Sequence, residues 1–580
     1  MASQSLHTPV SFFINGIVLE LKNTFFTIKK GEEDIHLLDD ICLKVPSRHF
    51  MAIVGPSGCG KSTLLKLIAG INVESQGNVY WNGRDLSEEE DLEPSEIGYV
   101  PQFSIAYDEL TVEESIESAV RLRVKTKNSD TFYAIVDRAL ESTGLMAIKD
   151  RPVKVLSGGQ KRRLALAMEL VTDPVLLLCD EVTSGLDPRS EQEIVKLMHD
   201  MSRNQNRIVI NVTHSLAGLD LYDSVLVLHE GKVVYHGPPR ALEHYFSVDE
   251  AENVYPTLTK RTSSDWQASW MKRQEQYYEN SGMNAQPDPN LASQAAQTPG
   301  HVAQFFALLG RRFKIMFRDS GQLLLQIAIL IGFPALVILF DLDGVDQTKS
   351  LSDALPSTLE QMKQERDVAT FNLNLGGLVS GLVMFQVILL TLMGSNNSAR
   401  EIAGERKIFE KEKLGGVRPG VYLASKVVYL SLLVFVQSFW MWLFVQTICD
   451  IPSTSPHHLL LLVLVNAAMT AICLGISGLA KSADQASLLS IYLVGFQLPL
   501  SGAVLALPSI AAWATRPFIS AYWTWAGIMD SLDPKHLRYV KEVTETWLSP
   551  VSICYLVLIV HIAAGLLLAY IGAKRAQWRE

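Results

Sequence analysis

The strongest constraint on the fold is the uneven distribution of apolar residues along the 580-residue chain. Up to about residue 300, apolar and charged residues are mixed over short distances, as in a soluble α/β domain. From about residue 321, six apolar runs each approach the roughly 20 residues that cross a bilayer as a helix. We place them at about 321–341, 371–395, 421–448, 458–480, 486–512 and 550–573. The sequence therefore predicts an α/β domain followed by an all-α six-helix transmembrane domain.

The first 250 residues show the alternation of strand and helix that is typical of α/β domains. Short apolar runs that predict strands lie at 17–21, 41–45, 50–54, 176–179, 207–212, 224–229 and 232–235. Residues 105–175 predict mostly helix. The runs at 176–179 and 207–212 each end in polar residues, as buried parallel strands do in βαβ units.

The turn after residue 54 has the composition of a phosphate-binding loop. It follows an apolar strand, opens a helix, and consists of Gly55, Pro56, Ser57, Gly58, Cys59, Gly60, Lys61, Ser62 and Thr63. Glycines let backbone N–H groups point at phosphate oxygens, and a helix N-terminus favours negative charge. We expect Lys61 to neutralise the β- and γ-phosphates of ATP and the Ser62 hydroxyl to bind Mg²⁺. This pattern is that of a Walker A loop in a P-loop ATPase.

Polar residues also follow two later strands. Asp180 and Glu181 come directly after the apolar run 176–179, and His214 ends the strand that begins at 208. We expect Asp180 to hold Mg²⁺ and Glu181 to polarise the attacking water as general base. A capping acidic pair and a structural histidine are the alternative interpretations.

Further motifs stand in a fixed order between the loop and His214: Gln102 in Tyr99-Val-Pro-Gln, then Leu156-Ser157-Gly158-Gly159-Gln160, and later Ser184-Gly-Leu-Asp187. The complete order resembles that of ABC-type ATPases: Walker A, Q-loop, signature, Walker B, D-loop and switch histidine. The resemblance implies that Gln102 senses Mg²⁺ and that His214 contacts the γ-phosphate. It also implies that Ser157, Gly158, Gly159, Gln160 and Asp187 meet the ATP site or surface of a second nucleotide-binding domain. Because this chain has one such domain, a partner subunit is expected.

The order of the domains adds a second resemblance. An ATPase at 1–250 that precedes a membrane domain at 321–580 resembles the ABCG half-transporters (White and pleiotropic-drug-resistance type) and their bacterial relatives. The run Glu405-Arg406-Lys-Ile-Phe-Glu-Lys-Glu412 resembles the E-R-x-x-F-x-x-E segment of ABCG proteins. It implies a cytoplasmic coupling elbow at about 400–418, with Glu405, Arg406 and Glu412 as coupling residues. The family favours lipid, sterol-like or drug substrates.

Between the two domains we expect a linker at 251–303, with some helix around 265–277, because Pro, Ser, Gln and Asn are frequent there. Residues 304–320 predict an amphipathic connecting helix that carries basic residues beside an apolar face, namely Arg311, Arg312, Lys314 and Arg318. An interfacial helix is favoured over an ordinary surface helix, since an apolar run follows directly.

Basic residues predict the orientation of the membrane segments. They concentrate before the first span, between spans two and three, and after the last span, which indicates that these loops and both termini are cytoplasmic. The aromatic stretch 518–529 is too short to span and predicts a re-entrant or interfacial segment. The N-terminus lacks the features of a secretory signal. We therefore expect an integral protein of the plasma (cell inner) membrane.

These patterns lead to one main hypothesis and leave alternatives open. The main hypothesis is ATP-driven export of hydrophobic or amphipathic substrates, with ATP and Mg²⁺ as cofactors. A second copy is the favoured partner, a related half-transporter in an obligate heterodimer is the other, and membrane lipid surrounds both. An ATP-gated regulatory or channel-like membrane protein is the alternative function. The net charge of −10 gives no sign of nucleic-acid binding.

Several features of the sequence are left without an assignment. Substrate residues remain unknown, although Phe385 and Phe496 lie in the spans that the resemblance places at a cavity. The resemblance implies an aromatic residue that stacks on adenine, but Ile28 occupies its position, with Phe25 and Phe26 nearby. A disulfide between Cys449 and Cys554 is an open alternative. Uncharged polar residues in the spans could line a path or join helices: Asn372, Asn374, Gln386, Gln437, Asn466 and Gln497. Two prolines could kink their helices: Pro334 and Pro499.

Overall fold

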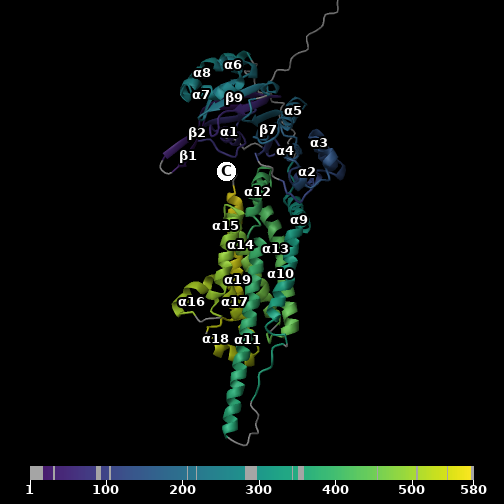
Figure 1. The fold of residues 1–580 in the computed structure, drawn as a ribbon, viewed down its shortest axis with the longest axis vertical. Helices are drawn as coiled ribbons and strands as arrows, with labels where there is room; N and C mark the ends of the chain where they lie inside the picture. Colours follow the sequence, from purple (N-terminus) through teal and green to yellow (C-terminus); the bar gives the residue numbers. More distant parts are fainter. Residues whose placement is uncertain are drawn as a thin grey trace, which may run out of the picture. The chain divides into compact units, whose positions relative to one another are not determined.

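The structure is a computed structural model that describes most of the chain. The described residues are 17–30, 33–86, 93–102, 106–204, 207–216, 218–280, 297–342, 344–350, 358–453, 455–503, 507–544 and 546–576. The chain divides into two compact units, one running to Ala303 and one beginning at Gln304 (Figure 1). Each unit has its own hydrophobic core, and each is described by itself below.

The first unit is built on a six-stranded sheet with the strand order β10-β9-β3-β8-β7-β6. The strands are β3 (Phe50–Val54), β6 (Ile97–Val100), β7 (Leu176–Asp180), β8 (Ile208–Val212), β9 (Ser224–His229) and β10 (Lys232–Gly237). All pairings are parallel except β9 with β10. Every residue of β3, β7 and β8 is buried, which explains why these strands are continuous apolar runs rather than alternating ones.

A second, antiparallel sheet has the order β2-β1-β4-β5. Its strands are β1 (Ile17–Lys30), β2 (Glu33–Pro46), β4 (Gln76–Trp81) and β5 (Arg84–Asp85). The predicted strands at 17–21 and 41–45 form the paired ends of β1 and β2, with Leu19 opposite Val45. Both strands extend further than their apolar residues indicated, because the register continues through polar residues to Lys30 and Glu33.

Helices of the first unit cover the strands and form a smaller helical group. They are α1 (Lys61–Ile68), α2 (Val112–Arg123), α3 (Ser129–Ser142), α4 (Gly158–Leu170), α5 (Pro188–Asn204), α6 (Pro239–Phe246), α7 (Val254–Leu258) and α8 (Ser263–Asn280). Helices α2, α3 and α4 share a separate apolar core. Thr111 and Glu114 form a capping box that fixes the start of α2.

The linker expected from residue 251 onward differs from the structure. Helices α7 and α8 lie inside that range, and Trp266 and Trp270 of α8 belong to the core of the first unit. The sequence did not predict that α8 packs against the core, because only one face of this helix is apolar and most of its residues are polar. The Pro- and Asn-rich stretch at 281–296 lies outside the described residues.

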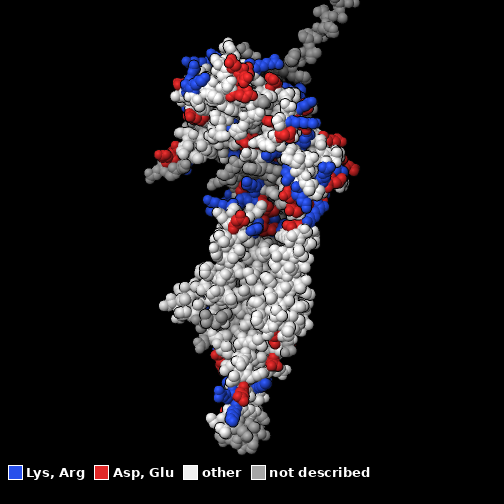
Figure 2. Space-filling model, viewed as in Figure 1, with Lys and Arg blue, Asp and Glu red and all other residues white. Residues whose placement is uncertain are grey.

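The second unit consists of helices. They are α9 (His301–Arg318), α10 (Ser320–Ile338), α11 (Thr358–Ser398), α12 (Arg406–Leu414), α13 (Pro419–Cys449), α14 (Ser455–Leu479), α15 (Ala483–Gln497), α16 (Ser509–Thr515), α17 (Ser520–Asp530), α18 (Pro534–Thr544) and α19 (Val551–Arg575). On the face shown in Figure 2, a broad band over these helices carries no Lys, Arg, Asp or Glu side chains. Such a band suits contact with lipid.

The expectation of six uninterrupted spans is corrected by the structure. Among the described residues, five helices are long and apolar enough to cross a membrane. The predicted span 486–512 instead forms α15, whose 15 residues rise only about 22 Å against a hydrocarbon core of about 30 Å. Helix α15 ends two residues before Pro499, which has no N–H group to donate to a helix. Pro334, in contrast, lies inside α10 without ending it.

Two other membrane-domain expectations can be compared with the fold. The aromatic stretch 518–529 forms the short helix α17, whose Tyr522 and Trp525 are fully buried. Helix α11 begins at Thr358, earlier than the span predicted at 371–395. All six cysteines are free, so the structure does not contain the disulfide considered for Cys449 and Cys554.

Five of the six uncharged polar residues in the spans are buried: Asn372, Gln386, Gln437, Asn466 and Gln497. Gln437 of α13 exchanges hydrogen bonds with Asn397 of α11 at 2.7 and 3.0 Å, and accepts one from Asn466 of α14 at 3.3 Å. These contacts support the helix-joining interpretation. Asn374 is exposed. Of the two candidate cavity residues, Phe385 packs edge-on against Phe340 at 5.5 Å, whereas Phe496 is exposed.

Candidate nucleotide-binding site

The loop between β3 and α1 has a backbone that requires glycine at its first position. Gly55 has a φ of 154°, and a Cβ atom there would lie 2.2 Å from the carbonyl oxygen of Leu228. Lys61, the first residue of α1, is buried and donates hydrogen bonds to the carbonyl oxygens of Gly55 (2.9 Å) and Pro56 (3.0 Å). A positive charge is thereby kept within the loop, next to the N-terminus of α1, as anion binding requires.

Cys59 lies in the same loop and is buried. Burial raises the pKa of the Cys59 thiol, and the neighbouring Lys61 opposes that shift only in part. A thiol with a raised pKa is largely protonated at neutral pH, so Cys59 acts as a packing residue in the loop rather than as a nucleophile.

Asp180, the last residue of β7, lies beside the loop. Its Oδ1 atom accepts a hydrogen bond from the Ser62 hydroxyl at 2.9 Å, and its Oδ2 atom accepts one from the Tyr99 hydroxyl at 3.2 Å. The parallel pairing of β6, β7 and β8 brings the carboxyl ends of these strands together at one edge of the sheet. Ligand sites of open α/β sheets form at this edge.

The next residue, Glu181, is held by two polar side chains. Gln102 Nε2 donates to Glu181 Oε2 at 2.9 Å, and His214 Nε2 lies 2.7 Å from Glu181 Oε1. Glu181 also has a φ of 49°, an uncommon backbone conformation for a residue other than glycine. Both carboxylate oxygens are therefore oriented, and the strained backbone is of the kind that occurs at functional positions.

The signature residues begin a helix. Ser157 caps α4: its hydroxyl accepts from the backbone N–H of Gln160 at 3.3 Å, while Gln160 Oε1 accepts from the backbone N–H of Ser157 at 3.0 Å. Cβ atoms at Gly158 and Gly159 would lie 3.4 Å from Leu186 and 3.6 Å from Ser190. The signature thus packs against the start of α5.

Asp187 caps that helix, since its Oδ1 atom accepts from the backbone N–H of Ser190 at 3.1 Å. Hydrogen bonds from Ser190 lower the pKa of Asp187. Asp187 therefore remains ionised at neutral pH and leaves a negative charge on the exposed end of α5.

The structure brings the predicted site residues together in small groups. Ser62 bonds Asp180, and Gln102 and His214 bond Glu181, so two hydrogen-bonded groups lie on consecutive residues. Ser157, Gln160 and Asp187 make local hydrogen bonds at the starts of α4 and α5.

Sequence reasoning missed two residues of this region. Tyr99 contacts Asp180, and Arg162 of α4 donates a hydrogen bond to the backbone carbonyl of Gln102. Tyr99 could have been found from the sequence, because it lies near the end of β6 and only three residues before Gln102. For Arg162 there was none, because basic residues on a helix usually face solvent.

Ser62 and Asp180 are suited to Mg²⁺. A hydroxyl and a carboxylate oxygen are hard ligands of the kind that Mg²⁺ prefers, and this ion usually takes few protein ligands together with phosphate oxygens and water. Consistent with that habit, no cluster of three or more His, Cys, Asp or Glu side chains with metal-binding geometry occurs within the described part of the chain.

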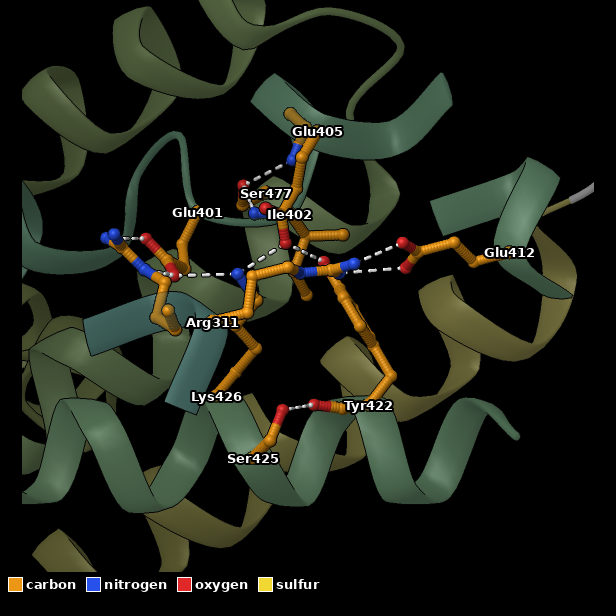
Figure 3. Close-up of polar contacts among 11 residues, drawn as sticks. Arg311, Glu401, Ile402, Glu405, Glu412, Tyr422, Ser425, Lys426 and Ser477 are labelled. Atoms are coloured by element: carbon orange, nitrogen blue, oxygen red, sulfur yellow. Dashed lines mark hydrogen bonds and ion pairs between the residues drawn. The ribbon is translucent and has the colours of Figure 1, made fainter. Parts of the chain in front are cut away.

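The coupling residues form a second polar site within the second unit (Figure 3). Arg311 of α9 pairs with Glu412 of α12, with Nη2 2.9 Å from Oε2. Tyr422 of α13 donates to Glu405 at 2.6 Å, and Lys426 pairs with the same carboxylate. Arg406 donates to the carbonyl oxygen of Gly478 in α14. All three predicted coupling residues therefore tie separate helices together.

Residues that the sequence motif did not include complete this coupling cluster. Glu401 accepts hydrogen bonds from Arg312 at 2.6 and 2.9 Å and from Lys426 at 2.9 Å. Burial opposes the charge on Arg312, but Glu401 raises its pKa above the usual range. Ser477 of α14 accepts from the backbone N–H groups of Ile402 and Ala403. Two of the arginines expected at a membrane interface, Arg311 and Arg312, thus have buried side chains in ion pairs, whereas Arg318 is exposed.

Comparisons with known proteins agree with this division. The family model described as ABC transporter matches residues 38–184, and the model described as ABC-2 type transporter matches residues 303–523. A P-loop ATPase domain is therefore joined to a membrane domain of the ABC-2 type.

Two relatives show the extent of the similarity. The ABC transporter ATP-binding/permease protein Rv1747 of Mycobacterium tuberculosis is 29% identical over 500 residues, covering 84% of this chain and 54% of its own length. The energy-coupling factor transporter ATP-binding protein EcfA1 of Mycoplasma mobile is 34% identical over 228 residues, covering 39% of this chain and 82% of its own. The chain belongs to the ABC transporter family. It spans about half the length of the mycobacterial relative.

Solved structures also align with the first unit. The dimeric ATP-binding cassette MJ0796, in a post-hydrolysis state with ADP and Pi, is 27% identical with a TM-score of 0.35; the alignment covers 38% of this chain and 99% of that one. For cbiO1 from Clostridium perfringens the identity is 27% and the TM-score 0.37, over 44% and 99% of the two chains.

Proposed function

We propose that the chain is an ATP-driven exporter of hydrophobic or amphipathic molecules, and that it acts as a dimer with two composite ATP sites. One observation supports the proposal: the Ser62–Asp180 and Gln102–Glu181–His214 contacts lie beside the phosphate loop of a chain whose described residues include five helices long and apolar enough to cross a membrane. An ABC ATPase joined to an ABC-2-type membrane domain implies ATP-driven transport across a membrane.

The residues of the first unit would divide the work of hydrolysis. Lys61 and the backbone of Gly55–Thr63 would bind the phosphates, while Ser62 and Asp180 would hold Mg²⁺, which neutralises phosphate charge. Glu181 would orient and polarise the attacking water, because both of its oxygens are already oriented by Gln102 and His214. His214 would also contact the γ-phosphate.

A dimer is inferred from the signature residues. Ser157–Gln160 and Asp187 lie at the starts of α4 and α5, and by resemblance to ABC ATPases they would face the nucleotide of a second nucleotide-binding domain. A second copy is the simplest partner because every motif is intact in this chain, and a related half-transporter is the other. We place the protein in the plasma (cell inner) membrane, with both termini cytoplasmic. This orientation requires an even number of crossings, so α15 and the residues that follow it would make the sixth crossing beside the five longer helices.

The substrate class is inferred from the membrane unit. Its interior offers neutral polar residues that are bonded to one another, together with aromatic and aliphatic side chains, and the buried ionic groups are concentrated in the coupling cluster. A path through such helices favours lipid, sterol-like or drug molecules over ions.

The test is Glu181→Gln in the full-length protein reconstituted in lipid discs and vesicles. Loss of a general base is expected to lower ATPase turnover by about 10²–10⁴-fold while nucleotide binding remains. The matched control is Glu141→Gln, an exposed carboxylate on α3, which should leave turnover unchanged. Normal turnover in Glu181→Gln would contradict the catalytic assignment.

Transport is measured separately with the wild-type protein. ATP-dependent movement of a fluorescent lipid or an amphipathic dye across vesicles is expected, and Glu181→Gln should abolish it. ATP hydrolysis without movement of any of these probes would instead favour the regulatory or channel-like alternative.

A further inference from the structure

Tyr99 brings a buried hydroxyl group to the carboxylate that the proposed function assigns to Mg²⁺. The residue ends in a phenol whose oxygen donates to Asp180 Oδ2 at 3.2 Å. The opposite oxygen of the same carboxylate, Oδ1, accepts from the Ser62 hydroxyl at 2.9 Å. The two donors therefore hold Asp180 from both sides, and only one of them belongs to a recognised motif.

The ring of Tyr99 is fixed from several directions. Tyr99 is 5% exposed and belongs to the core of the first unit. It lies on β6 opposite Leu178 of β7, next to the strand that ends in Asp180. Its backbone N–H donates to Glu169 Oε2 at 3.2 Å, and Arg123 donates to the same oxygen at 2.9 Å. The hydroxyl is thus delivered to Asp180 by a rigid side chain.

We infer that Tyr99 is a positioning residue for the metal–nucleotide complex: its hydroxyl holds Oδ2 of Asp180 so that Oδ1 faces the Ser62 hydroxyl. A carboxylate rotates about its terminal bond through a broad energy minimum, so one donor on one oxygen does not define its plane. A second donor on the other oxygen does. The end of β6 and the residues directly after it contact both acidic residues, since Gln102, three residues after Tyr99, donates to Glu181. The inference rests on the proposed function.

The test is Tyr99→Phe in the full-length protein, with Mn²⁺ as the probe in place of Mg²⁺. Electron paramagnetic resonance measures bound Mn²⁺ in the presence of a non-hydrolysable ATP analogue. Loss of one hydrogen bond to a charged group is expected to weaken Mn²⁺ binding by roughly five- to tenfold. Binding of the same analogue in EDTA should stay unchanged, because the hydroxyl contacts the carboxylate and not the phosphate loop.

The matched control is Tyr222→Phe. Tyr222 is 6% exposed in the same core, and its hydroxyl accepts a hydrogen bond from Asn211 Nδ2 at 2.7 Å, not one from the acidic pair. Both variants lose one buried hydroxyl contact and keep the ring, so both should lower the unfolding temperature by a similar amount. Only Tyr99→Phe should shift Mn²⁺ affinity, and a purely structural role for Tyr99 would not produce that difference.

A double-mutant cycle of Tyr99→Phe with Asp180→Asn separates an effect on Mn²⁺ affinity from an effect on the stability of the protein. In the Asp180→Asn background, Tyr99→Phe should cause no further change in Mn²⁺ affinity. Unchanged affinity in Tyr99→Phe alone, an equal shift in Tyr222→Phe, or a full additional shift in the Asp180→Asn background would each overturn the inference. Failure of the wild-type protein to bind Mn²⁺ with the analogue would instead overturn the proposed site itself.

Discussion

Neighbouring side chains in this protein have different environments, and the environment decides their chemistry. Asp180 and Glu181 are consecutive, yet Asp180 faces two hydroxyl groups and Glu181 faces an amide and an imidazole. Hydroxyl donors leave a carboxylate free to share an oxygen with a metal ion. A histidine partner suits a group that handles a proton. We therefore expect the two acids to differ in role because their hydrogen-bond partners differ.

Two buried histidines of the first unit lead to a prediction about pH. His49 and His236 both contact the Ser224 hydroxyl, at 2.7 and 3.2 Å. Burial lowers the pKa of His49 to about 4 and that of His236 to about 3. The Asp223 carboxylate, 4.0 Å from His49, and nearby Arg203 act on His49 in opposite senses. Both histidines are therefore neutral in the folded protein at pH 5 and above.

The sign follows from the lowered pKa values. An unfolded histidine binds a proton below pH 6.5, whereas these two stay neutral in the folded protein down to about pH 4, so acid favours unfolding. Each should cost about 2 kcal/mol of stability between pH 7 and pH 5. We expect the unfolding temperature of the full-length protein to fall over that range, and to fall less steeply in His236→Gln. An equal slope in wild type and variant would contradict this account.

At the scale of elements, helix packing in the second unit depends on very close backbone approach. A Cβ atom at Gly572 of α19 would lie 2.5 Å from the backbone of Gly478 in α14, and one at Gly565 would lie 2.4 Å from the backbone of Ala471. Membrane helices associate through such small residues because lipid offers no hydrophobic driving force between them. The two glycines therefore hold α14 and α19 in contact along two turns.

Gly572→Ala is expected to push α19 away from α14, because the added methyl group meets backbone rather than a movable side chain. Yield of monodisperse protein and unfolding temperature should both fall. Gly332→Ala in α10 is the control: a Cβ there meets nothing within 4 Å, and alanine favours helix over glycine by about 1 kcal/mol. Equal behaviour of the two variants would show that close packing at Gly572 is not needed.

At the scale of the whole chain, the coupling cluster joins segments that are far apart in sequence. Arg311 and Glu412 are 101 residues apart, and Arg312 and Glu401 are 89 residues apart. The side chains of Arg312, Glu401 and Lys426 are all less than 10% exposed. Removing one partner of such a group leaves a buried charge uncompensated, which typically costs 3–5 kcal/mol.

A charge exchange tests this arrangement. Arg311→Glu alone should destabilise the protein by about 3–5 kcal/mol, since it places a second carboxylate beside Glu412, and adding Glu412→Arg should recover a large part of the loss. The same exchange at Arg538 and Glu542 is the control, because that pair on α18 is exposed and worth at most about 1 kcal/mol. Yield of monodisperse protein and the unfolding temperature are the measurements. No recovery in the double variant would contradict direct pairing.

Much of the fold could be read from local patterns, and the exceptions have physical reasons. Strands β3, β7 and β8 are uniformly apolar because both faces are buried, and the polar residues after them mark the sheet edge where the site forms. The segment expected as one helix at 486–512 is interrupted after Gln497, because hydropathy does not register the missing N–H of Pro499. The helix expected around 265–277 was assigned to the linker because most of its residues are polar. Its two tryptophans, Trp266 and Trp270, nevertheless pack into the core of the first unit.

By itself, the sequence determined which chemical groups this protein carries and in which order, because the phosphate loop, the acidic pair and the apolar runs are local in the chain. Only the tertiary structure decided their partners. The hydroxyl of Tyr99 contacts Asp180. Gln102 and His214 contact opposite oxygens of Glu181. Glu401 lies between Arg312 and Lys426 and bonds both. A hydrogen bond or a buried ion pair depends on distances between segments that packing brings together, and no local pattern records those distances.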